Sequence, residues 1–524
     1  MLRKIGLVVG ILLLTASYSN AGNVQTFGVG SAASAQGEAV SAYSNDPFAV
    51  YYNPAGLVLT KRSVISTGFM GYTPNIEIEN FKAISADGTD QNAAAGYASD
   101  FEIKNSDVMI PHMGYAMPIN EKLFFGIAAY SPYGLHVEWS KNPTKNPGAA
   151  YAWESYYGRM VVTPSLGYKI NDKLSVGFGV SLGESVSEAG KTFTRSPKTI
   201  AKANAAAAAY TSLAAAATAT ANTAGGNAAT AMGEGRMDDY YSYMVQAGVS
   251  TQAATTFQGA AAEAKGAELL YTTLNGSYLR LEAKDDFNYS FNAGVMYQPI
   301  DAISMGLTYR GRTKTKFEGD TIVTGATSLL DPTGDKINIG GSVDMEYDHP
   351  ESIQAGVRYF ASKTLSVEFD MTWTRWSILD KQVENVVLKN VPVLGNVPLS
   401  FAHARNWEDT IQYKIGTEWK LLSNVALRGG YTYDPTPIPD DTFDMGWPDT
   451  DRSIFNIGCG WGLTENWVLD SVVQYVVSTP TRTVSGGSPE FNDEYSSVYG
   501  ETVEVSLKDK GTLWGFGMTL SYLF

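Results

Sequence analysis

The sequence predicts an all-β protein, a transmembrane antiparallel β-barrel of about fourteen strands. The first observation behind this prediction is a two-residue alternation of apolar and polar side chains, which recurs at 174–182, 303–310, 365–374 and 514–524. Such alternation is typical of strands with one apolar face. The second observation is that short turns alternate with long connections, as in barrels of bacterial outer membranes.

The length of the alternating stretches favours a membrane barrel over a soluble β-sandwich. Soluble strands average about five or six residues, whereas a tilted strand needs roughly 9–11 to cross a bilayer. The predicted short turns lie at 118–122, 170–173, 298–301, 361–363, 421–424 and 463–466. The long connections lie near 133–155, 189–284, 319–341, 380–405, 435–450 and 481–500. This arrangement places both chain ends on the periplasmic side.

Residues 1–21 predict a cleaved export signal. Arg3 and Lys4 precede an apolar run at 5–14, which is too short to span a bilayer because a spanning helix needs about 20 residues. Ser19-Asn20-Ala21 fits a small-residue cleavage site. We therefore expect a mature chain that starts at Gly22 and resides in the bacterial outer membrane.

Composition excludes several classes of function. A net charge of −15 argues against a nucleic-acid partner, which would require a basic surface. The single cysteine, Cys459, excludes an internal disulfide framework, and the four histidines lack paired metal-ligand spacing. We expect no metal, no cofactor and no enzymatic activity. An outer-membrane lipase stays open as an alternative, since a catalytic triad is recognised by geometry.

Residues 22–59 precede the predicted barrel, 60–524, and are rich in small residues. A barrel of about fourteen strands is too wide for its own side chains to fill, so its lumen holds water or a plug. Asn53-Pro54-Ala55-Gly56 predicts a tight turn at the end of this segment. We interpret 22–59 as a compact plug, with a disordered periplasmic tail as the alternative.

The stretch FGVGSAASAQGEAVSAYSNDPFAVYYNPAGL, residues 27–57, resembles the N-terminal hatch of the FadL family of outer-membrane transporters. Further similar segments follow in family order at 161–181, 291–319, 349–359 and 427–452. The resemblance implies a hatch-closed barrel, an internal apolar pocket near the N-terminal tail, and lateral exit through the wall beside a kinked strand. It also implies that Asn53, Pro54, Ala55 and Gly56 shape the hatch and its fit to the wall.

Strand parity predicts lumen-facing basic residues that are candidates for ligand binding: Arg159, Arg310, Lys414 and Arg428. A carboxylate ligand would favour arginine, which donates two hydrogen bonds in a fork. The alternative is that these residues pair with lumen acids or with hatch residues such as Asp46. Phe27, in the tail, is predicted to act as a stopper of the pocket.

An alanine-rich insertion at about 189–284 departs from the family pattern. High helix propensity predicts two helical stretches, with a break at Gly225-Gly226, in an extracellular loop. The insertion could serve surface contacts or be partly disordered. We expect surrounding partners to be outer-membrane lipid and lipopolysaccharide, expect recognition of the C-terminal Phe524 by the barrel-assembly machinery, and expect a monomer.

The function predicted from these observations is passive uptake of hydrophobic molecules, with long-chain fatty acids first among them. The alternative within the same class is an aromatic-hydrocarbon or alkane channel. A general porin for hydrophilic solutes is a further alternative, although a plugged lumen argues against it.

Overall fold

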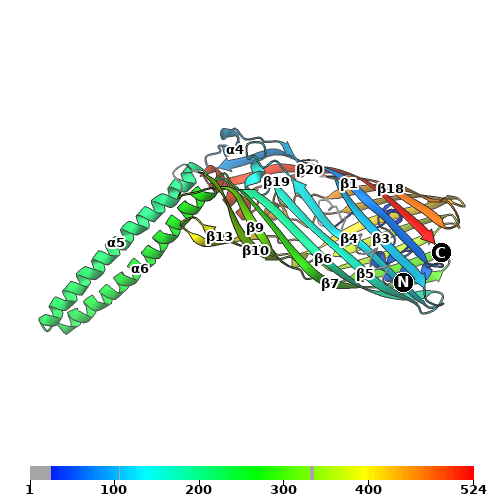
Figure 1. Ribbon diagram of the computed structural model, residues 1–524, viewed down its shortest axis with the longest axis horizontal. Helices are drawn as coiled ribbons and strands as arrows, with labels where there is room; N and C mark the ends of the chain where they lie inside the picture. The colour runs from blue at the N-terminus through cyan, green and yellow to red at the C-terminus, as the bar shows by residue number, and fades with distance from the viewer. Residues whose placement is uncertain (1–24, 105–106, 331–334) are drawn as a thin grey trace.

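A computed structural model describes residues 25–104, 107–330 and 335–524; the predicted signal peptide and residues 22–24 lie outside these ranges. Fourteen strands close into one antiparallel barrel, with β20 paired to β1 (Figure 1). In ring order they are β1 (Val64–Ser85), β3 (Val108–Pro118), β4 (Leu123–Glu138), β5 (Glu154–Lys169), β6 (Leu174–Thr192), β7 (Tyr278–Ile300), β8 (Ile303–Arg310), β11 (Ser352–Phe360), β12 (Leu365–Thr374), β15 (Thr410–Leu422), β16 (Val425–Asp434), β17 (Arg452–Gly462), β18 (Trp467–Ser478) and β20 (Val503–Leu523). The predicted fold class is confirmed.

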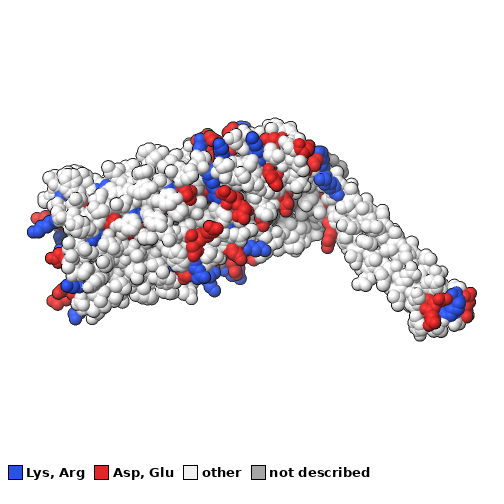
Figure 2. Space-filling model, turned by 180° about the vertical axis from the view of Figure 1, so that it is seen from behind, with Lys and Arg blue, Asp and Glu red and all other residues white. Residues whose placement is uncertain are grey.

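The two faces of each wall strand differ in the way the alternation predicts. In β12, Phe369 and Met371 are exposed on the outer face, whereas Glu368 and Asp370 are fully buried on the inner face. Figure 2 shows a largely uncharged band on the wall between charged residues at the periplasmic rim and at the extracellular end. Among the described residues, no helix is long and apolar enough to cross a membrane.

Several predicted loops contain strands instead. Six further strands extend the wall on the extracellular side: β2 (Phe101–Glu102), β9 (Lys316–Thr327), β10 (Lys336–Glu346), β13 (Lys381–Val391), β14 (Gly395–Ala404) and β19 (Arg482–Ser485). The long connection predicted at 133–155 is shorter than expected, because β4 continues to Glu138 and β5 begins at Glu154. The long connections predicted at 319–341 and 380–405 were wrong in part, because strands β9, β10, β13 and β14 lie in them. The reason is that β7 outruns β8 and offers its free edge to β9, which then pairs with β10, β10 with β13, and β13 with β14.

The segment before the barrel lies inside the lumen (Figure 1). It consists of α2 (Ser31–Ser34), α3 (Ala49–Tyr52) and the 3₁₀-helix η1 (Pro54–Leu59). The wall begins at Val64 rather than at the predicted residue 60, because η1 continues to Leu59 and residues 60–63 connect it to β1. We call residues 25–59 the hatch.

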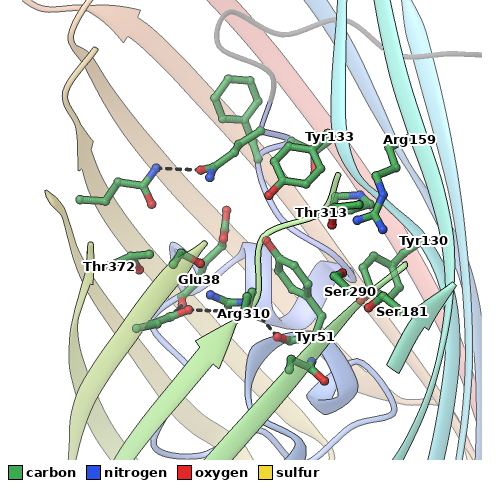
Figure 3. Close-up of a pocket in the computed structure, with 18 of the residues that line it drawn as sticks. Glu38, Tyr51, Tyr130, Tyr133, Arg159, Ser181, Ser290, Arg310, Thr313 and Thr372 are labelled. Atoms are coloured by element: carbon green, nitrogen blue, oxygen red, sulfur yellow. Dashed lines mark hydrogen bonds between the residues drawn. The ribbon is translucent and has the colours of Figure 1, made fainter. Parts of the chain in front are cut away.

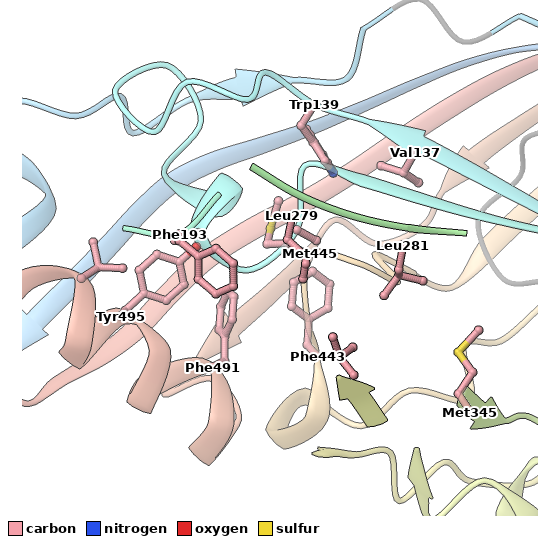
Figure 4. Close-up of a cluster of buried hydrophobic side chains, with 14 of the residues drawn as sticks. Val137, Trp139, Phe193, Leu279, Leu281, Met345, Phe443, Met445, Phe491 and Tyr495 are labelled. Carbon is pink, nitrogen blue, oxygen red and sulfur yellow. The ribbon is translucent and has the colours of Figure 1, made fainter. Parts of the chain in front are cut away.

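The extracellular end has an apolar core of its own. Short helices α4 (Gln91–Ala94), η2 (Pro147–Ala150), η3 (Trp376–Ile378), η4 (Asp440–Thr442) and α7 (Pro489–Tyr499) lie in its loops. Figure 4 shows buried side chains from distant segments meeting there, among them Trp139, Leu281, Phe443 and Phe491. This cluster packs the extracellular loops against one another and against the ends of the strands.

The alanine-rich insertion forms a long antiparallel helical hairpin, α5 (Pro197–Gly233) and α6 (Met237–Leu274), that projects away from the barrel (Figure 1). The predicted break at Gly225-Gly226 is wrong, because α5 runs straight through both glycines. Each helical glycine costs only about 1 kcal/mol relative to alanine, and the surrounding alanines favour the helix. The turn instead uses Gly235, whose φ of +75° lies in the left-handed region.

Candidate functional site

Asn53 and its neighbours fasten the end of the hatch. The Asn53 side-chain oxygen accepts a hydrogen bond from the Ala55 amide (3.0 Å) and caps η1. Its amide group donates to the Ser41 carbonyl (2.7 Å) within the hatch and to the Val295 carbonyl (3.1 Å) in β7. A side chain at Gly56 would lie 2.4 Å from the Ser44 carbonyl oxygen. The motif thus ties the hatch to itself and to the wall.

A belt of wall glycines receives the hatch. On ten different strands, a Cβ at the inward-facing glycine would collide with hatch atoms, most within 2.7 Å. The belt comprises Gly114, Gly126, Gly167, Gly177, Gly294, Gly306, Gly356, Gly416, Gly430 and Gly458. At Gly306 the added atom would lie 2.0 Å from the Ser41 carbonyl oxygen. Because only glycine permits so close an approach of backbones, the wall is shaped to hold this segment.

Buried charges in the wall bind the hatch backbone directly. Glu368 accepts from the Ala42 amide (2.6 Å) and from Arg358 (2.5 Å), and all three groups are buried. The neighbouring Asp370 accepts from the Ser41 amide (3.1 Å). Arg358 also donates to the side chain of Gln36 (2.6 Å). These charge-assisted hydrogen bonds fix the position of the hatch.

A cavity of about 60 Å³ lies between the wall, the body of the hatch and the first hatch residues, 25–27, which we call the tail (Figure 3). Three tyrosines line it, Tyr51 from the hatch and Tyr130 and Tyr133 from β4. Phe27 separates this cavity from a second one of about 50 Å³ beside β18 and β20. Its ring is 4% exposed and packs edge-on against Tyr72 at 5.8 Å between centroids. We call the first space the tail cavity.

Three of the four predicted basic residues line the tail cavity. Lys414 lies 3.4 Å from the Glu38 carboxylate of the hatch. Arg310 donates to the Tyr51 carbonyl (3.0 Å) and to Gln354 (2.6 Å), and Arg159 donates through Nε to Asn288 (2.8 Å). Among the described residues, neither arginine has a carboxylate within 4 Å, and Nη2 of Arg159 has no hydrogen-bond partner.

The fourth basic residue, Arg428, lies elsewhere. It does not line the tail cavity and instead pairs with Glu418 (2.9 Å) and Asp470 (2.6 Å). Arg428 thus follows the alternative prediction, in which a lumen-facing basic residue pairs with acids of the lumen.

A discontinuity in the wall lies next to the tail cavity. Pairing between β3 and β4 ends at Met113 with Ala129, although β4 continues to Glu138. Its pairing with β5 shifts register between Tyr130 and Tyr133, around Pro132, whose missing N–H interrupts a ladder. Thr26 of the tail donates to the carbonyls of Pro132 (3.2 Å) and Ser131 (3.0 Å) at this point. The tail therefore contacts the one place where β4 leaves its neighbour β3.

A larger cavity of about 330 Å³ lies at the extracellular end, near the base of the hairpin. Its lining mixes apolar groups such as Leu281 and Phe401 with charged ones. Burial raises the pKa of Glu384 to about 6 and lowers the pKa of His403 to about 4. In the part of the chain that is described, no group of three or more His, Cys, Asp or Glu side chains could hold a metal ion.

Comparison with known proteins identifies the family. Residues 11–524 match the model of the outer membrane protein transport protein family (OMPP1/FadL/TodX). The chain belongs to this family. It is accordingly an outer-membrane transporter of hydrophobic compounds with a β-barrel fold, in a family of transporters and channels.

The relatives are distant but extend over the full length. The long-chain fatty acid transport protein of Escherichia coli O6:H1 is 20% identical, over 99% of this chain and 98% of that protein. A Pseudomonas aeruginosa FadL homologue of known structure superimposes with a TM-score of 0.66 at 16% identity, covering 96% of this chain and 100% of its own. The Pseudomonas putida toluene transporter TodX gives 0.61 at 14%, covering 95% and 99%. These structural likenesses show that the chain has the same β-barrel fold as the two solved structures.

Sequence reasoning missed the tyrosines of the tail cavity and the wall discontinuity. Tyr51 lies in the hatch stretch and Tyr130 in β4, but no pattern in the sequence marks either of them as a pocket residue, and only the fold brings their rings together. Pro132 was a usable signal, since a proline within an alternating stretch indicates an interrupted strand.

Proposed function

We propose that this transporter takes up long-chain fatty acids and binds their carboxylate in the tail cavity through Arg159. The observation that carries the proposal is that Arg159 is 3% exposed, has a free Nη2, and has no carboxylate partner among the described residues. Burying an uncompensated charge is costly. A fatty-acid carboxylate would supply both the missing negative charge and two hydrogen-bond acceptors.

Arg310 strengthens this interpretation. It too contributes a guanidinium to the cavity without a carboxylate, although its hydrogen bonds to Gln354 and the Tyr51 carbonyl are in place. The two acids that line the cavity, Glu38 and Asp434, are engaged with Lys414 and Arg452. The lining therefore carries more positive than negative charge, which suits an anionic head group better than a neutral hydrocarbon.

Loading of an acyl chain requires movement of the tail. The tail cavity, about 60 Å³, is smaller than the roughly 150 Å³ cavity that holds one benzene. Phe27 forms the wall between this cavity and the next, so displacement of its ring would join the two spaces. Phe27 thus acts as the stopper, and residues 25–27 as the gating segment.

Exit occurs sideways, at the β3–β4 discontinuity. There the tail is held to β4 by the hydrogen bonds of Thr26, so a tail displaced by ligand also releases β4. Lateral exit keeps the acyl chain out of water, which is worth about 0.8 kcal/mol per buried methylene. The larger cavity at the extracellular end provides an entry chamber on the extracellular side of the tail cavity.

Uptake of aromatic hydrocarbons is the second candidate, because Tyr51 and Tyr130 present rings to the tail cavity, 5.3 Å apart between centroids. TodX and the CymD channel are monoaromatic hydrocarbon transporters with this fold. An arene would form favourable aromatic contacts with these two rings, but it would leave Arg159 without a negatively charged partner.

Equilibrium binding of labelled oleate and toluene to the purified chain separates the candidates. Arg159→Gln should weaken oleate binding roughly tenfold to a hundredfold, the worth of a charged hydrogen bond, and leave toluene binding unchanged. Arg428→Gln is the matched control and should bind oleate like the wild type. Toluene binding without oleate binding in the wild type would refute the proposal, and equal oleate affinity in Arg159→Gln would remove the carboxylate site.

A further inference from the structure

The hairpin formed by α5 and α6 has small side chains inside and large apolar ones outside. Between the two helices, buried or half-buried alanines recur at alternating spacings of three and four residues, at 214, 217, 221, 224, 228 and 231. This is the heptad spacing of a coiled-coil seam. Large apolar side chains would normally occupy such a seam, because they bury the most surface. Here they lie on the outer faces instead.

The exposed apolar residues gather toward the tip. Tyr241, Val245 and Val249 follow one another at intervals of four on α6, so they share one face, and they are 61%, 67% and 63% exposed. We call these three residues the tip stripe. Met232 and Met244 are also exposed close to the turn. Contiguous exposed apolar surface of this kind marks an interaction site.

The hairpin surface carries almost no charge along its length. No charged residue occurs between Lys202 and Glu234 in α5, or between Asp239 and Glu263 in α6. Figure 2 shows the projecting rod as uncharged, with charges only at its tip and base. An acidic or basic partner would lose solvation there without gaining an opposite charge. The partner must therefore itself be neutral and apolar.

The direction of the rod is fixed at its base. Arg195, just before α5, donates two hydrogen bonds to Glu494 of α7 (2.8 and 3.1 Å), and Lys202 donates to the Gly500 carbonyl (2.9 Å). Copies embedded in one membrane thus hold their tip stripes at the same height. Confinement in a plane raises their effective concentration for each other.

We propose that the hairpin is a self-association surface, on which the tip stripe packs against the hairpin of a second copy in the same membrane. A helix of 37 residues is about 55 Å long and about 10 Å wide, so one face of the two-helix rod offers roughly 1,100 Å². A standard interface needs about 800 Å² from each partner. The area is sufficient, and the second copy meets the requirement for a neutral apolar partner. The barrel, expected to be a monomer, becomes part of a dimer through this rod.

Disulfide trapping in outer membranes tests the proposal. In a Cys459→Ser background, Val245→Cys should give a disulfide-linked dimer as the main species after oxidation. Asn227→Cys is the matched control; it is exposed on α5 at a similar distance from the turn and should stay monomeric. No dimer at Val245, or equal dimer at both positions, would overturn the proposal.

A second measurement does not depend on cysteine geometry. Copies labelled with donor or acceptor dyes at Asn227→Cys should show energy transfer in outer membranes. Tyr241→Ser with Val249→Ser should abolish that transfer, while hydrogen exchange of the α5 amides shows that the hairpin is still folded. Transfer that survives both substitutions in a folded hairpin would contradict the role of the tip stripe.

Discussion

Residues 31–42 of the hatch and residues 203–233 of the hairpin are both built mainly from alanine, glycine and serine or threonine. In the hatch these side chains are buried against a wall that presents a belt of glycines. In the hairpin, Gly225, Gly226 and Gly233 have nothing within 4 Å of an added Cβ. Small residues thus permit close backbone approach inside the barrel, whereas outside it they supply helix propensity and a thin seam. Composition alone does not distinguish these two uses.

The largest expected effect comes from breaking the buried charges that hold the hatch. Glu368→Ala leaves the buried Arg358 without its carboxylate partner and the Ala42 amide without an acceptor. Loss of one member of a buried pair costs about 3–5 kcal/mol, so the hatch should loosen while the wall stays closed. The rate of cleavage within residues 25–59 by protease added from the periplasmic side measures how far the hatch has loosened.

Glu351→Ala provides the control for that prediction. Glu351 pairs with Arg375 at 3.0 Å, and the arginine side chain is half exposed. Such surface pairs contribute about 0–1 kcal/mol, so the hatch should remain protected. Equal protease sensitivity in the two variants would show that the hatch is not held by the Glu368 network.

Replacing glycine by alanine should destabilise the packing of the hatch but stabilise the hairpin. Gly306→Ala places a Cβ 2.0 Å from the Ser41 carbonyl oxygen, and overpacking of this kind costs about 1–3 kcal/mol. Gly226→Ala, in open space within α5, should stabilise the helix by up to about 1 kcal/mol. Amide hydrogen exchange should become faster in the hatch of the first variant and slower in α5 of the second. Changes of equal sign would refute the distinction between the two regions.

Features of the fold that depend on neighbouring residues in the chain could be predicted from the sequence. Alternation revealed the lipid-facing and lumen-facing sides of β12, and the Asn-Pro-Ala-Gly turn marked the end of the hatch. Contacts between distant segments could not be predicted in this way. Arg159 and Arg428 have the same parity, yet only folding decides that Arg428 meets Glu418 and Asp470 while Arg159 meets no acid among the described residues. Gly225 was misjudged because helix termination depends on the whole neighbouring run of alanines.

Pro54→Ala should have a small effect on stability and still a measurable effect on transport. Pro54 occupies the first turn of η1, where its fixed φ reduces the entropy of the unfolded chain, and its loss costs about 0.4–1 kcal/mol. The barrel should therefore fold normally, as heat-modifiable mobility on gels would show. Because the Pro54 backbone packs against Gly177, a more mobile turn loosens the fit of the hatch to the wall beside the tail cavity. Uptake of radiolabelled oleate should fall, and uptake equal to that of the wild type would show that the motif shapes the hatch without influencing transport.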